Sequence, residues 1–379
     1  MKICDEFVVD SGTNAPQEKK YFDAASDLIF LRAGHLSNIN LDGSIKIEYL
    51  DRITQQAVDN LNLKRFAKNT VVFPKSGQSV NTNNIAWLPS DCFIVNHLAC
   101  LYADDKVKVR YLYHLLKQFQ ISNFSEKSDY PSINLEAIRA FKIPLPPKAR
   151  QEAIVKEINT VQQKEKTELD KFIQLNIKLN NLFSTLNYPI EKLGNIAEFK
   201  NGLNYSEKST GDLVTIVGVK DFLEDFSPNL DKLVDVRIDG NLSETYKLKS
   251  GDILVVRSNG SANLVGRFIY IDKLLKDTSY SGFTIRIRAN SEKINSKYLC
   301  YCLRTESVRN AITKDPKGAN IKSLNQTMLS SISVPIPPIE EQLKIINKTE
   351  KLENEIALIE RELSTIDQEK EQVLIKYLV

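Results

Sequence analysis

The chain of 379 residues is long enough for two or three domains of ordinary size. It has 42% hydrophobic and 26% charged residues and a net charge of +3, a composition that excludes a disordered or fibrous protein. The longest apolar runs, such as 253–256, are too short to cross a bilayer, and no signal peptide is expected. We therefore expect a cytoplasmic protein without a membrane segment.

Residues 1–146 alternate strand-like runs with short helices. IFLRA at 29–33 and TVVF at 70–73 are rich in β-branched and aromatic residues, which is typical of strands. RYLYHLLKQF at 110–119 places apolar residues on one face, which predicts a helix. This mixture indicates an α+β domain and not a series of βαβ units.

A proline joint, KIPLPP at 142–147, leads into a charged segment without Gly or Pro. Proline ends a strand and fits the first turn of a helix, so the joint predicts a long helix over 147–188. Lys148 and Arg150 oppose the helix dipole, so only the prolines support this start. Glu165 and Glu168 interrupt an apolar heptad seam, a row with steps of four and three residues. The predicted seam contains Ile154, Ile158, Phe172, Leu175, Leu179 and Leu182.

Residues 189–336 repeat the first domain, and residues 337–379 repeat the helix. Aligning Pro144 with Pro335 superimposes the joints at an offset of 191 residues, and elsewhere the offset drifts between 182 and 191. The strand-like runs 252–256, 267–271 and 283–287 and the helical run 297–305 belong to the second copy. Further aligned pairs are Gly12 with Gly202, Ser76 with Ser258, Tyr111 with Tyr298, and Gln151 with Gln342. The second seam contains Ile345, Leu352, Ile356, Ile359, Leu363 and Ile366.

The two heptad seams predict that the long helices pair. A 3.5-residue period over four heptads is typical of a supercoiled pair, and repetition within one chain favours an antiparallel one. The alternative is that each seam packs only on its own globular domain. From Ile154 to Leu186 a helix spans about 50 Å at about 1.5 Å per residue, so the pair would act as a ruler.

The positive charge lies on the globular copies. The helical segments 147–188 and 337–379 have net charges of +2 and −4, which leaves +5 for the rest of the chain. Two weakly basic domains held apart suit one long anionic partner, and DNA is the obvious one.

Loops of similar chemistry follow matching strands in the two copies. PKSGQSVN at 74–81 and RSNGSAN at 257–263 each offer a cation, small residues and amides that can pair with adenine or phosphate. The alternative for Asn259-Gly260 is a tight hairpin turn with positive φ. A second loop pair, at 127–132 and 317–322, has the alternative of a solvated connector. The residues predicted to contact DNA are Lys75, Ser76, Gln78, Asn81, Lys127, Tyr130, Lys200, Arg257, Ser258, Asn259, Asn263, Lys317, Asn320 and Lys322.

Catalytic signatures are missing. There is no GxxxxGK[ST] phosphate loop, no Asn/Asp-Pro-Pro-Tyr/Phe motif of amino-methylating enzymes, no HExxH and no nucleophile elbow. The five cysteines form no CxxC pair and are expected to be reduced thiols in a packed interior. The three histidines, His35, His97 and His114, are more typical of packed or surface residues than of catalysts. These absences and the duplication favour a non-catalytic binder with two half-sites and no metal.

The arrangement resembles the DNA specificity (S) subunit of type I restriction–modification systems over essentially the whole chain. The resemblance rests on the joints IPLPPKARQEAI at 143–154 and VPIPPIEEQLKI at 334–345 with their helices. It also rests on Lys192-Leu193-Gly194-Asn195, which starts the second copy, and on GDILVVRSNGS at 251–261.

This resemblance implies a function. Residues 1–146 and 189–336 would be target recognition domains, each reading one half of a split double-stranded DNA sequence. The helices 147–188 and 337–379 would form an antiparallel coiled coil that sets the gap and docks two modification (methyltransferase) subunits. Those subunits would bind S-adenosylmethionine, while this chain would bind no cofactor. Restriction (motor–nuclease) subunits would complete a phage-defence enzyme in which this chain is not catalytic.

Three alternatives stay open on the sequence. The chain could serve as the specificity subunit of another phage-defence methyltransferase. It could be a stand-alone DNA methyltransferase or nuclease, although their motifs are missing. It could also be a scaffold whose lobes bind protein or glycan.

Overall fold

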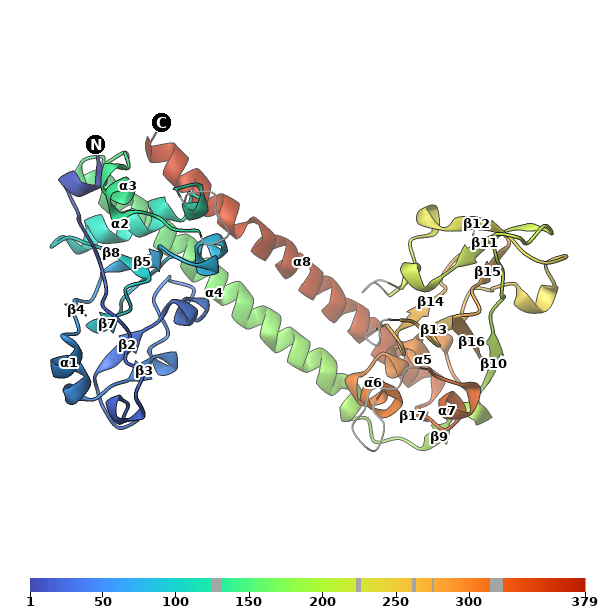
Figure 1. The fold of residues 1–379 in the computed structure, drawn as a ribbon. Helices are drawn as coiled ribbons and strands as arrows, with labels where there is room; N and C mark the ends of the chain where they lie inside the picture. The colour runs from blue at the N-terminus through green and yellow to red at the C-terminus, as the bar shows by residue number, and fades with distance from the viewer. Residues whose placement is uncertain (125–130, 223–225, 261–263, 275, 314–322, 379) are drawn as a thin grey trace. The chain divides into compact units, whose positions relative to one another are not determined.

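The computed structural model describes residues 1–379 except 125–130, 223–225, 261–263, 275, 314–322 and 379. It contains two compact units, Met1–Lys171 with Ile359–Val379 and Phe172–Leu358. Each unit comprises a globular lobe and a stretch of both long helices, α4 (Lys148–Ser184) and α8 (Ile339–Leu378) (Figure 1). We call residues 1–147 lobe 1 and residues 185–338 lobe 2.

The described residues of lobe 1 form two four-stranded sheets and three short α-helices. The first sheet has the order β1-β8-β5-β6 and is antiparallel throughout. The second has the order β3-β2-β7-β4, with β2 and β7 parallel. The strands are β1 (Val8–Ser11), β2 (Ile29–Leu31), β3 (Asp51–Arg52), β4 (Arg65–Phe66), β5 (Val71–Pro74), β6 (Ala86–Trp87), β7 (Cys92–Ile94) and β8 (Leu98–Tyr102), and the helices are α1 (Gln55–Leu61), α2 (Lys106–Leu116) and α3 (Leu135–Ala140).

Strand β5 is buried on both faces. Val71 and Phe73 belong to the hydrophobic core that includes α2, and Val72 belongs to the core between the two sheets. Because successive side chains of a strand point to opposite faces, a strand between two cores needs apolar residues at every position. This explains why TVVF reads as a continuous apolar run.

Lobe 2 repeats this topology, except that no counterpart of β4 lies among its described residues. Its first sheet has the order β10-β16-β13-β14, and its second has the order β12-β11-β15, with β11 and β15 parallel. Strand β9 pairs with β17, where lobe 1 has only an isolated bridge between Lys2 and Lys142. The predicted duplication into two similar α+β lobes is confirmed. The strands are β9 (Ile190–Lys192), β10 (Ala197–Asn201), β11 (Leu213–Val217), β12 (Val234–Arg237), β13 (Ile253–Val256), β14 (Phe268–Tyr270), β15 (Thr278–Tyr280), β16 (Thr284–Ala289) and β17 (Ser333–Pro335), and the helices are α5 (Ser296–Leu303), α6 (Glu306–Thr313) and α7 (Gln326–Ser330).

The aligned glycines Gly12 and Gly202 have the same packing role. A Cβ on Gly12 would lie 1.9 Å from the carbonyl oxygen of Ile94, and one on Gly202 would lie 2.2 Å from that of Ser281. Only glycine lets the two backbones approach so closely. The glycine is therefore a structural requirement in both copies.

Each proline joint is held by a buried tyrosine and a buried glutamine. In unit 1 the Tyr111 hydroxyl donates to the carbonyl of Pro144 at 2.7 Å, and Gln151 Nε2 donates to that of Pro146 at 2.8 Å. Helix α4 begins at the residue after the second proline. Lys148, whose charge opposes the helix dipole, pairs with an aspartate, Asp105, at 2.8 Å.

The second joint contains the same contacts and one more. The Tyr298 hydroxyl donates to the carbonyl of Pro335 at 3.0 Å, and Gln342 Nε2 donates to that of Pro337 at 2.8 Å. Gln342 Oε1 also accepts the N–H of Asn295, the N-cap of α5, at 2.7 Å. The aligned side chains therefore hold the backbone where prolines cannot donate hydrogen bonds.

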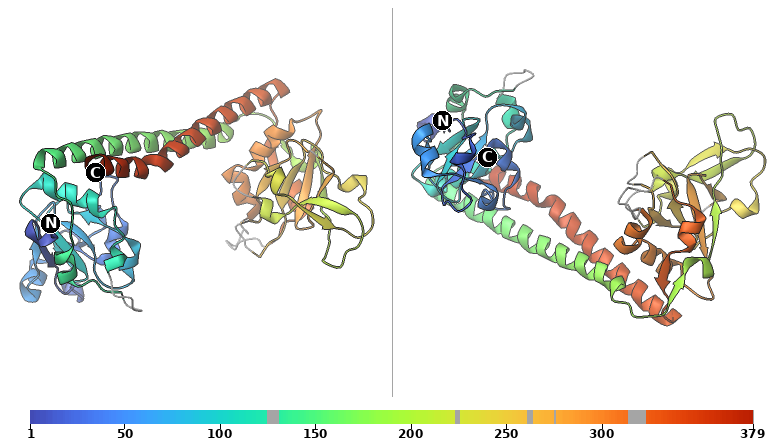
Figure 2. Two further views of the ribbon diagram at one scale, coloured as in Figure 1. Left: turned by 90° about the horizontal axis from the view of Figure 1, so that it is seen from above. Right: turned by 60° about the horizontal axis from the view of Figure 1, so that its bottom comes forward.

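The two long helices pack together and run antiparallel in unit 1 (Figures 1 and 2). Residue numbers rise along α4 as they fall along α8, from the ion pair of Glu157 with Lys376 at 2.9 Å to the adjacent pairs of Lys164 with Glu369 at 2.9 Å and Glu165 with Lys370 at 2.7 Å. The helices also complete the lobe cores, because α4 and α8 each contribute buried residues to the core of lobe 1. Packing of each helix on its own lobe therefore accompanies the pairing and does not replace it.

The seam residues lie on the less exposed side of both helices. In α8, Leu363 is half-buried and the other predicted seam positions are buried: Ile345, Leu352, Ile356, Ile359 and Ile366. In α4, Ile154 and Ile158 are buried and the remaining positions are half-buried: Phe172, Leu175, Leu179 and Leu182.

Four of the five cysteines are buried. Cys92, Cys100, Cys300 and Cys302 are buried free thiols, but Cys4 is exposed, so the expectation of a packed thiol is wrong there. Burial raises the pKa of the Cys300 thiol to about 12. Within the described ranges, no helix combines the length and the apolar character needed to span a bilayer.

Candidate nucleic-acid interface

In lobe 2 the loop after β13 is held by backbone hydrogen bonds on both sides. The Arg257 N–H donates to the carbonyl of Phe283 at 2.8 Å, and the Leu324 N–H donates to the carbonyl of Arg257 at 2.7 Å. Ser258 and Ser323 form an antiparallel bridge. The loop after β13 therefore lies beside the chain that enters α7, which directly follows the second predicted loop.

Lobe 1 contains the same arrangement. The Lys75 N–H donates to the carbonyl of His97 at 2.9 Å, and the Ile133 N–H donates to the carbonyl of Lys75 at 2.7 Å. Ser76 Oγ lies 2.7 Å from His97 Nδ1. His97 therefore occupies in lobe 1 the place that Phe283 occupies in lobe 2.

The predicted loop cations are available to a polyanion. Lys75 and Arg257 are half-buried, and neither pairs with a carboxylate in the part of the chain that the structure describes. Gln78 and Asn81 are exposed on a 3-10 turn, Gln78–Thr82, where Asn81 Nδ2 donates to Gln78 Oε1 at 3.2 Å. These groups offer one charge and several amide hydrogen-bonding atoms at a single loop.

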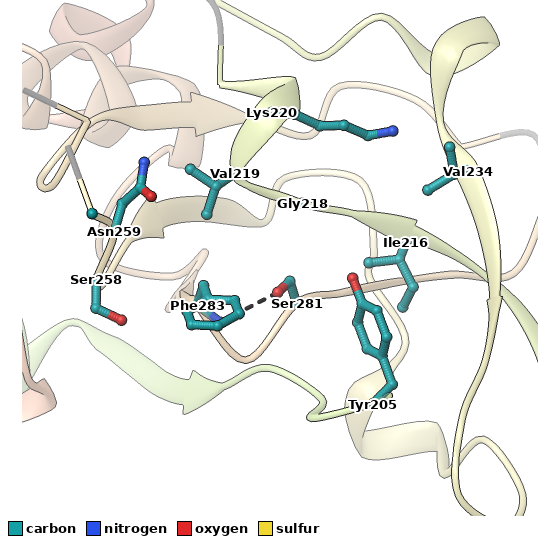
Figure 3. A pocket seen from close by; sticks show the side chains of 11 residues that line it. Tyr205, Ile216, Gly218, Val219, Lys220, Val234, Ser258, Asn259, Ser281 and Phe283 are labelled. Carbon is teal, nitrogen blue, oxygen red and sulfur yellow. Dashed lines mark hydrogen bonds between the residues drawn. The ribbon is translucent and has the colours of Figure 1, made fainter. Parts of the chain in front are cut away.

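A pocket of about 550 Å³ opens beside the loop of lobe 2 (Figure 3). Ser258 and Asn259 line one side, and Lys220 and Tyr205 line other parts of the wall. Phe283 also lines the pocket and is 59% exposed. An exposed aromatic ring beside a cation and an amide suits stacking and hydrogen bonding with a nucleic acid.

The sequence analysis missed Lys220, Tyr205 and Phe283. Lys220 lies on a 3-10 turn after β11, Val219–Asp221, which is closed by a hydrogen bond from the Gly218 N–H to Asp221 Oδ2 at 2.8 Å. No motif marks these residues, because β11 and the loop after β13 are brought together only by the fold. Phe283 had one available signal, since extending the repeat alignment through 92–98 and 278–284 places it opposite His97.

Lys200, a predicted contact residue, is engaged elsewhere. Its Nζ donates to Thr245 Oγ1 at 2.9 Å and lies over the ring of Tyr246. Lys200 does not line the pocket beside Arg257. The structure therefore does not bring Lys200 together with the predicted loop residues.

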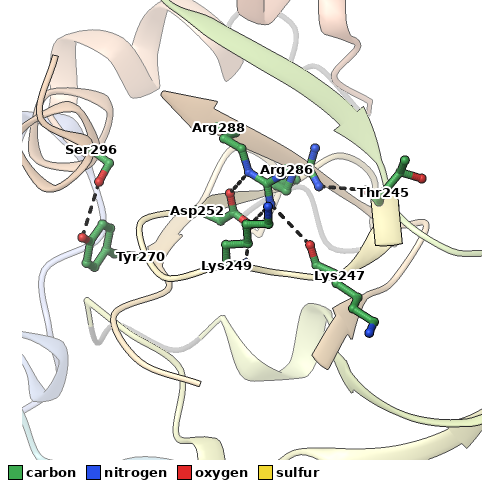
Figure 4. Close-up of polar contacts among 8 residues, drawn as sticks. All are labelled: Thr245, Lys247, Lys249, Asp252, Tyr270, Arg286, Arg288 and Ser296. Carbon is green, nitrogen blue, oxygen red and sulfur yellow. Dashed lines mark hydrogen bonds and ion pairs between the residues drawn. The ribbon is translucent and has the colours of Figure 1, made fainter. Parts of the chain in front are cut away.

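Asp252 of the GDILVV motif has a structural role (Figure 4). Its carboxylate is 1% exposed and accepts two hydrogen bonds from Arg288, from Nε and Nη2, each at 2.7 Å. It also accepts the Lys249 N–H at 2.7 Å. The bond to Asp252 raises the pKa of Arg288. This pair fastens the start of β13 to β16 and so positions the strand that ends at Arg257.

The alternative of a tight hairpin with positive φ at Asn259-Gly260 is wrong. Strands β13 and β14 do pair antiparallel, but their connection runs from 257 to 267. Neither Asn259 nor Gly260 has a positive φ, whereas Gly266 has a φ of 78°. Six predicted contact residues lie outside the described residues: Lys127, Tyr130, Asn263, Lys317, Asn320 and Lys322.

The described side chains form no metal centre. Within those ranges, no group of three or more His, Cys, Asp or Glu residues could hold a metal ion. Burial lowers the pKa of His114 to about 3, so its imidazole is neutral at physiological pH. The geometry supports binding by two similar surfaces, one on each lobe.

The sequence of this chain, with its two similar lobes and paired helices, matches the model of a known protein family. The family model "Type I restriction modification DNA specificity domain" matches residues 6–181 and again residues 188–368. The chain belongs to this family, and the predicted resemblance is confirmed. Members of this family are the specificity subunits of type I restriction enzymes, and these subunits are not catalytic.

Curated relatives are similar over part of their length. The chain is 27% identical over 294 residues to the type I restriction enzyme StySPI specificity subunit of Salmonella potsdam, covering 70% of this chain and 63% of that protein. It is 29% identical over 127 residues to the EcoKI specificity subunit of Escherichia coli (strain K12), covering 34% of this chain and 26% of that protein. The chain therefore aligns with less than two thirds of either relative.

Solved structures share the fold along the whole chain. The S subunit of a type I restriction-modification system from M. genitalium aligns with a TM-score of 0.55 at 16% identity, covering 100% of this chain and 95% of that one. A chain from a structural study of complex assembly and conformational transition in the type I R-M system aligns with a TM-score of 0.60 at 15% identity, covering 100% and 96%.

Proposed function

We propose that this chain is the DNA specificity subunit of a type I restriction-modification enzyme and acts on double-stranded DNA in the cytoplasm. Each lobe reads one half of a split target through the loops at Lys75 and Arg257. The observation that supports this most directly is the repeat of one loop arrangement, cation included, in two lobes of the same topology. A base-edge hydrogen-bonding pair contributes about 1–3 kcal/mol of discrimination, so a few per lobe separate right from wrong sites.

The long helices set the gap between the half-sites and dock the other subunits. Those partners are two methyltransferase subunits, which carry S-adenosylmethionine and methylate adenine, and restriction subunits with motor and nuclease activities. This chain contributes recognition and spacing but no catalysis or cofactor. The boundaries that we propose are 1–146 and 189–336 for the recognition domains and 147–188 and 337–379 for the spacer helices.

The decisive experiment maps methylated adenines in a genome that expresses this chain with its neighbouring methyltransferase. We expect one motif with two defined halves separated by a gap of undefined bases. Cells with the methyltransferase alone serve as the control and should lack this motif. A contiguous motif, or the same methylation without this chain, would contradict the proposal.

A further inference from the structure

A second pocket, of about 830 Å³, lies in unit 1 between the loop that holds Asp42, helix α2 and helix α4. Its lining includes three cations, Lys106, Arg110 and Lys166, and one carboxylate, that of Asp42. Within the described part of the chain, none of the three cations forms an ion pair. The pocket is therefore a concave, positively charged site that the proposed function does not use.

Arg110 is the most buried of these cations, because Lys106 and Lys166 are exposed. It is half-buried, lies over the ring of Trp87 and donates from Nη2 to Asn69 Oδ1 at a long 3.4 Å. The Asp42 carboxylate is engaged by Ser44, whose N–H and hydroxyl donate to Oδ1 at 2.9 and 2.7 Å. Burial lowers the pKa of Arg110 to about 10, and the charge of Asp42, which forms no ion pair with the guanidinium, offsets this shift only in part.

In unit 2 the cation that aligns with Arg110 forms an ion pair with a carboxylate. Arg110 precedes Tyr111 as Lys297 precedes Tyr298, so these two cations align. In unit 2, Lys297 Nζ pairs with Glu350 Oε1 on α8 at 2.5 Å. The residue of α4 that aligns with Glu350, at an offset of 191, is Asn159, which lines the pocket. Unit 1 therefore keeps the cation and lacks the carboxylate that pairs with it in unit 2.

Two further differences between α4 and α8 also make unit 1 more positively charged at the aligned positions. Glu353 of α8 accepts a hydrogen bond from the Tyr301 hydroxyl at 2.9 Å, and it aligns with Gln162 of α4. Lys166 of α4 aligns with Ala357. At these three aligned positions unit 1 therefore has two carboxylates fewer and one cation more than unit 2, and the ion pair of Lys297 with Glu350 has no equivalent at Arg110 among the described residues.

We propose that this pocket binds a phosphate group, supplied either by a free phosphate-bearing anion or by the backbone of DNA. Arg110 presents a planar set of donors that matches the oxygens of a phosphate, and Lys106 and Lys166 add charge. The amides of Asn159 and Gln163 also line the cavity and can donate hydrogen bonds. The cavity is larger than one carboxylate would fill, and three cations favour a multiply charged oxyanion.

Trp87 is the single tryptophan of the chain and lies under Arg110, so its fluorescence reports on the pocket. Pyrophosphate is titrated into the full chain at constant ionic strength, with equilibrium dialysis of labelled pyrophosphate in parallel. We expect a saturable change in emission and matching binding of one anion per chain. The variant Arg110→Gln is expected to bind about tenfold more weakly or worse, as loss of a charged hydrogen-bond donor implies.

The sharper variant is Asn159→Glu, which supplies the carboxylate that Lys297 already has in unit 2. It should pair with Arg110 and abolish pyrophosphate binding while the melting temperature is kept or raised. The matched control, Lys297→Gln, alters the aligned cation of the other unit and should leave binding unchanged. Competition by duplex DNA would identify a backbone phosphate as the occupant, and indifference to DNA would identify a free anion. Non-saturable titration of the unmodified chain, or full binding by folded Asn159→Glu, would overturn the proposal.

Discussion

Glu165 of α4 and Lys370 of α8 form an ion pair across the seam of the long helices, with Oε2 and Nζ 2.7 Å apart. Both side chains are only 18% exposed, so the pair is largely removed from water. Each residue interrupts the apolar row of its own helix, and Glu165 lies closer to Lys370 than does the exposed Asp367, whose Oδ1 is 3.4 Å from the Lys370 Nζ. The interruption therefore specifies which positions of the two helices meet, as a polar residue at a core position does in coiled coils.

This pair predicts strong non-additivity on substitution. Glu165→Leu should destabilise the chain by about 1–3 kcal/mol, because it leaves the Lys370 ammonium in the seam with only the exposed carboxylate of Asp367, at 3.4 Å, as its partner. Lys370→Leu should act similarly, and the double variant should recover much of the loss because two leucines pack together. Denaturant unfolding of the four proteins measures the coupling. Additive effects would show that the pair does not act as a unit.

The two proline joints provide a matched comparison of aligned glutamines. Gln342→Leu removes two hydrogen bonds, to Pro337 and from Asn295, whereas Gln151→Leu removes only the bond to Pro146. Gln342 and Gln151 are both buried, so the groups left behind lose their partners without regaining water. We expect a loss of about 2–4 kcal/mol for Gln342→Leu and about 1–2 kcal/mol for Gln151→Leu in denaturant unfolding. Equal losses would show that the bond to Asn295 contributes nothing.

Glu353 makes the stability of unit 2 depend on pH. Burial raises the pKa of its carboxyl, while the Tyr301 hydroxyl and Arg304 lower it in part. Because the folded pKa lies above the unfolded one, the favourable contribution is complete at pH values below the unfolded pKa. It declines as the pH rises through the folded pKa. When the pH is raised from 4 to neutrality, the melting temperature of Glu353→Gln should therefore fall less, or rise more, than that of the unmodified chain. Thermal unfolding at a series of pH values measures this difference. Parallel pH profiles of the two proteins would refute this.

Short-range signals predicted the frame of the molecule. The double prolines marked helix starts because they cannot continue a strand or donate to a ladder, and α4 and α8 begin after Pro147 and Pro338. The internal repeat then predicted the antiparallel pairing of the two long helices. A unit that occurs twice in one chain predicts two lobes of similar topology and two helices that pack together. Gly12 and Gly202 aligned because both approach a neighbouring backbone that admits no Cβ.

Contacts across the fold were beyond these signals. Lys220 and Phe283 line a pocket with Asn259, yet they come from separate loops that local sequence does not connect. The pairing of Glu165 with Lys370 depends on the relative register of two helices, and each residue alone reads as a defect in its seam. The Asn259-Gly260 step left a tight turn open as an alternative, but residues 257–267 separate the two paired strands, which is longer than a tight hairpin.

Lys75 and Arg257 provide a test of independent reading by the two lobes. Lys75→Ala should weaken methylation specificity in one half of the target and Arg257→Ala in the other, because each cation lies on the loop of its own lobe. If the cation contacts a phosphate, the slope of log affinity against log salt should fall by about one. Binding assays with duplexes that differ in one half-site separate these effects. Equal loss of specificity in both halves would contradict a two-lobe reader.

The length of the helix pair should determine the gap between the half-sites. One heptad inserted in α4 between Phe172 and Leu182, with a matching heptad in α8 between Leu352 and Ile359, keeps the seams apolar and lengthens the pair by about 10 Å. At about 3.4 Å per base pair, the preferred gap should grow by about three base pairs while the bases of each half stay the same. Removal of one heptad from each helix should shorten it by a similar amount. Mapping methylated adenines for each variant measures the gap, and a four-residue insertion, which turns the seam out of register, serves as the control. If the gap stayed constant while both variants folded and methylated DNA, spacing would have to come from the partner subunits and not from these helices.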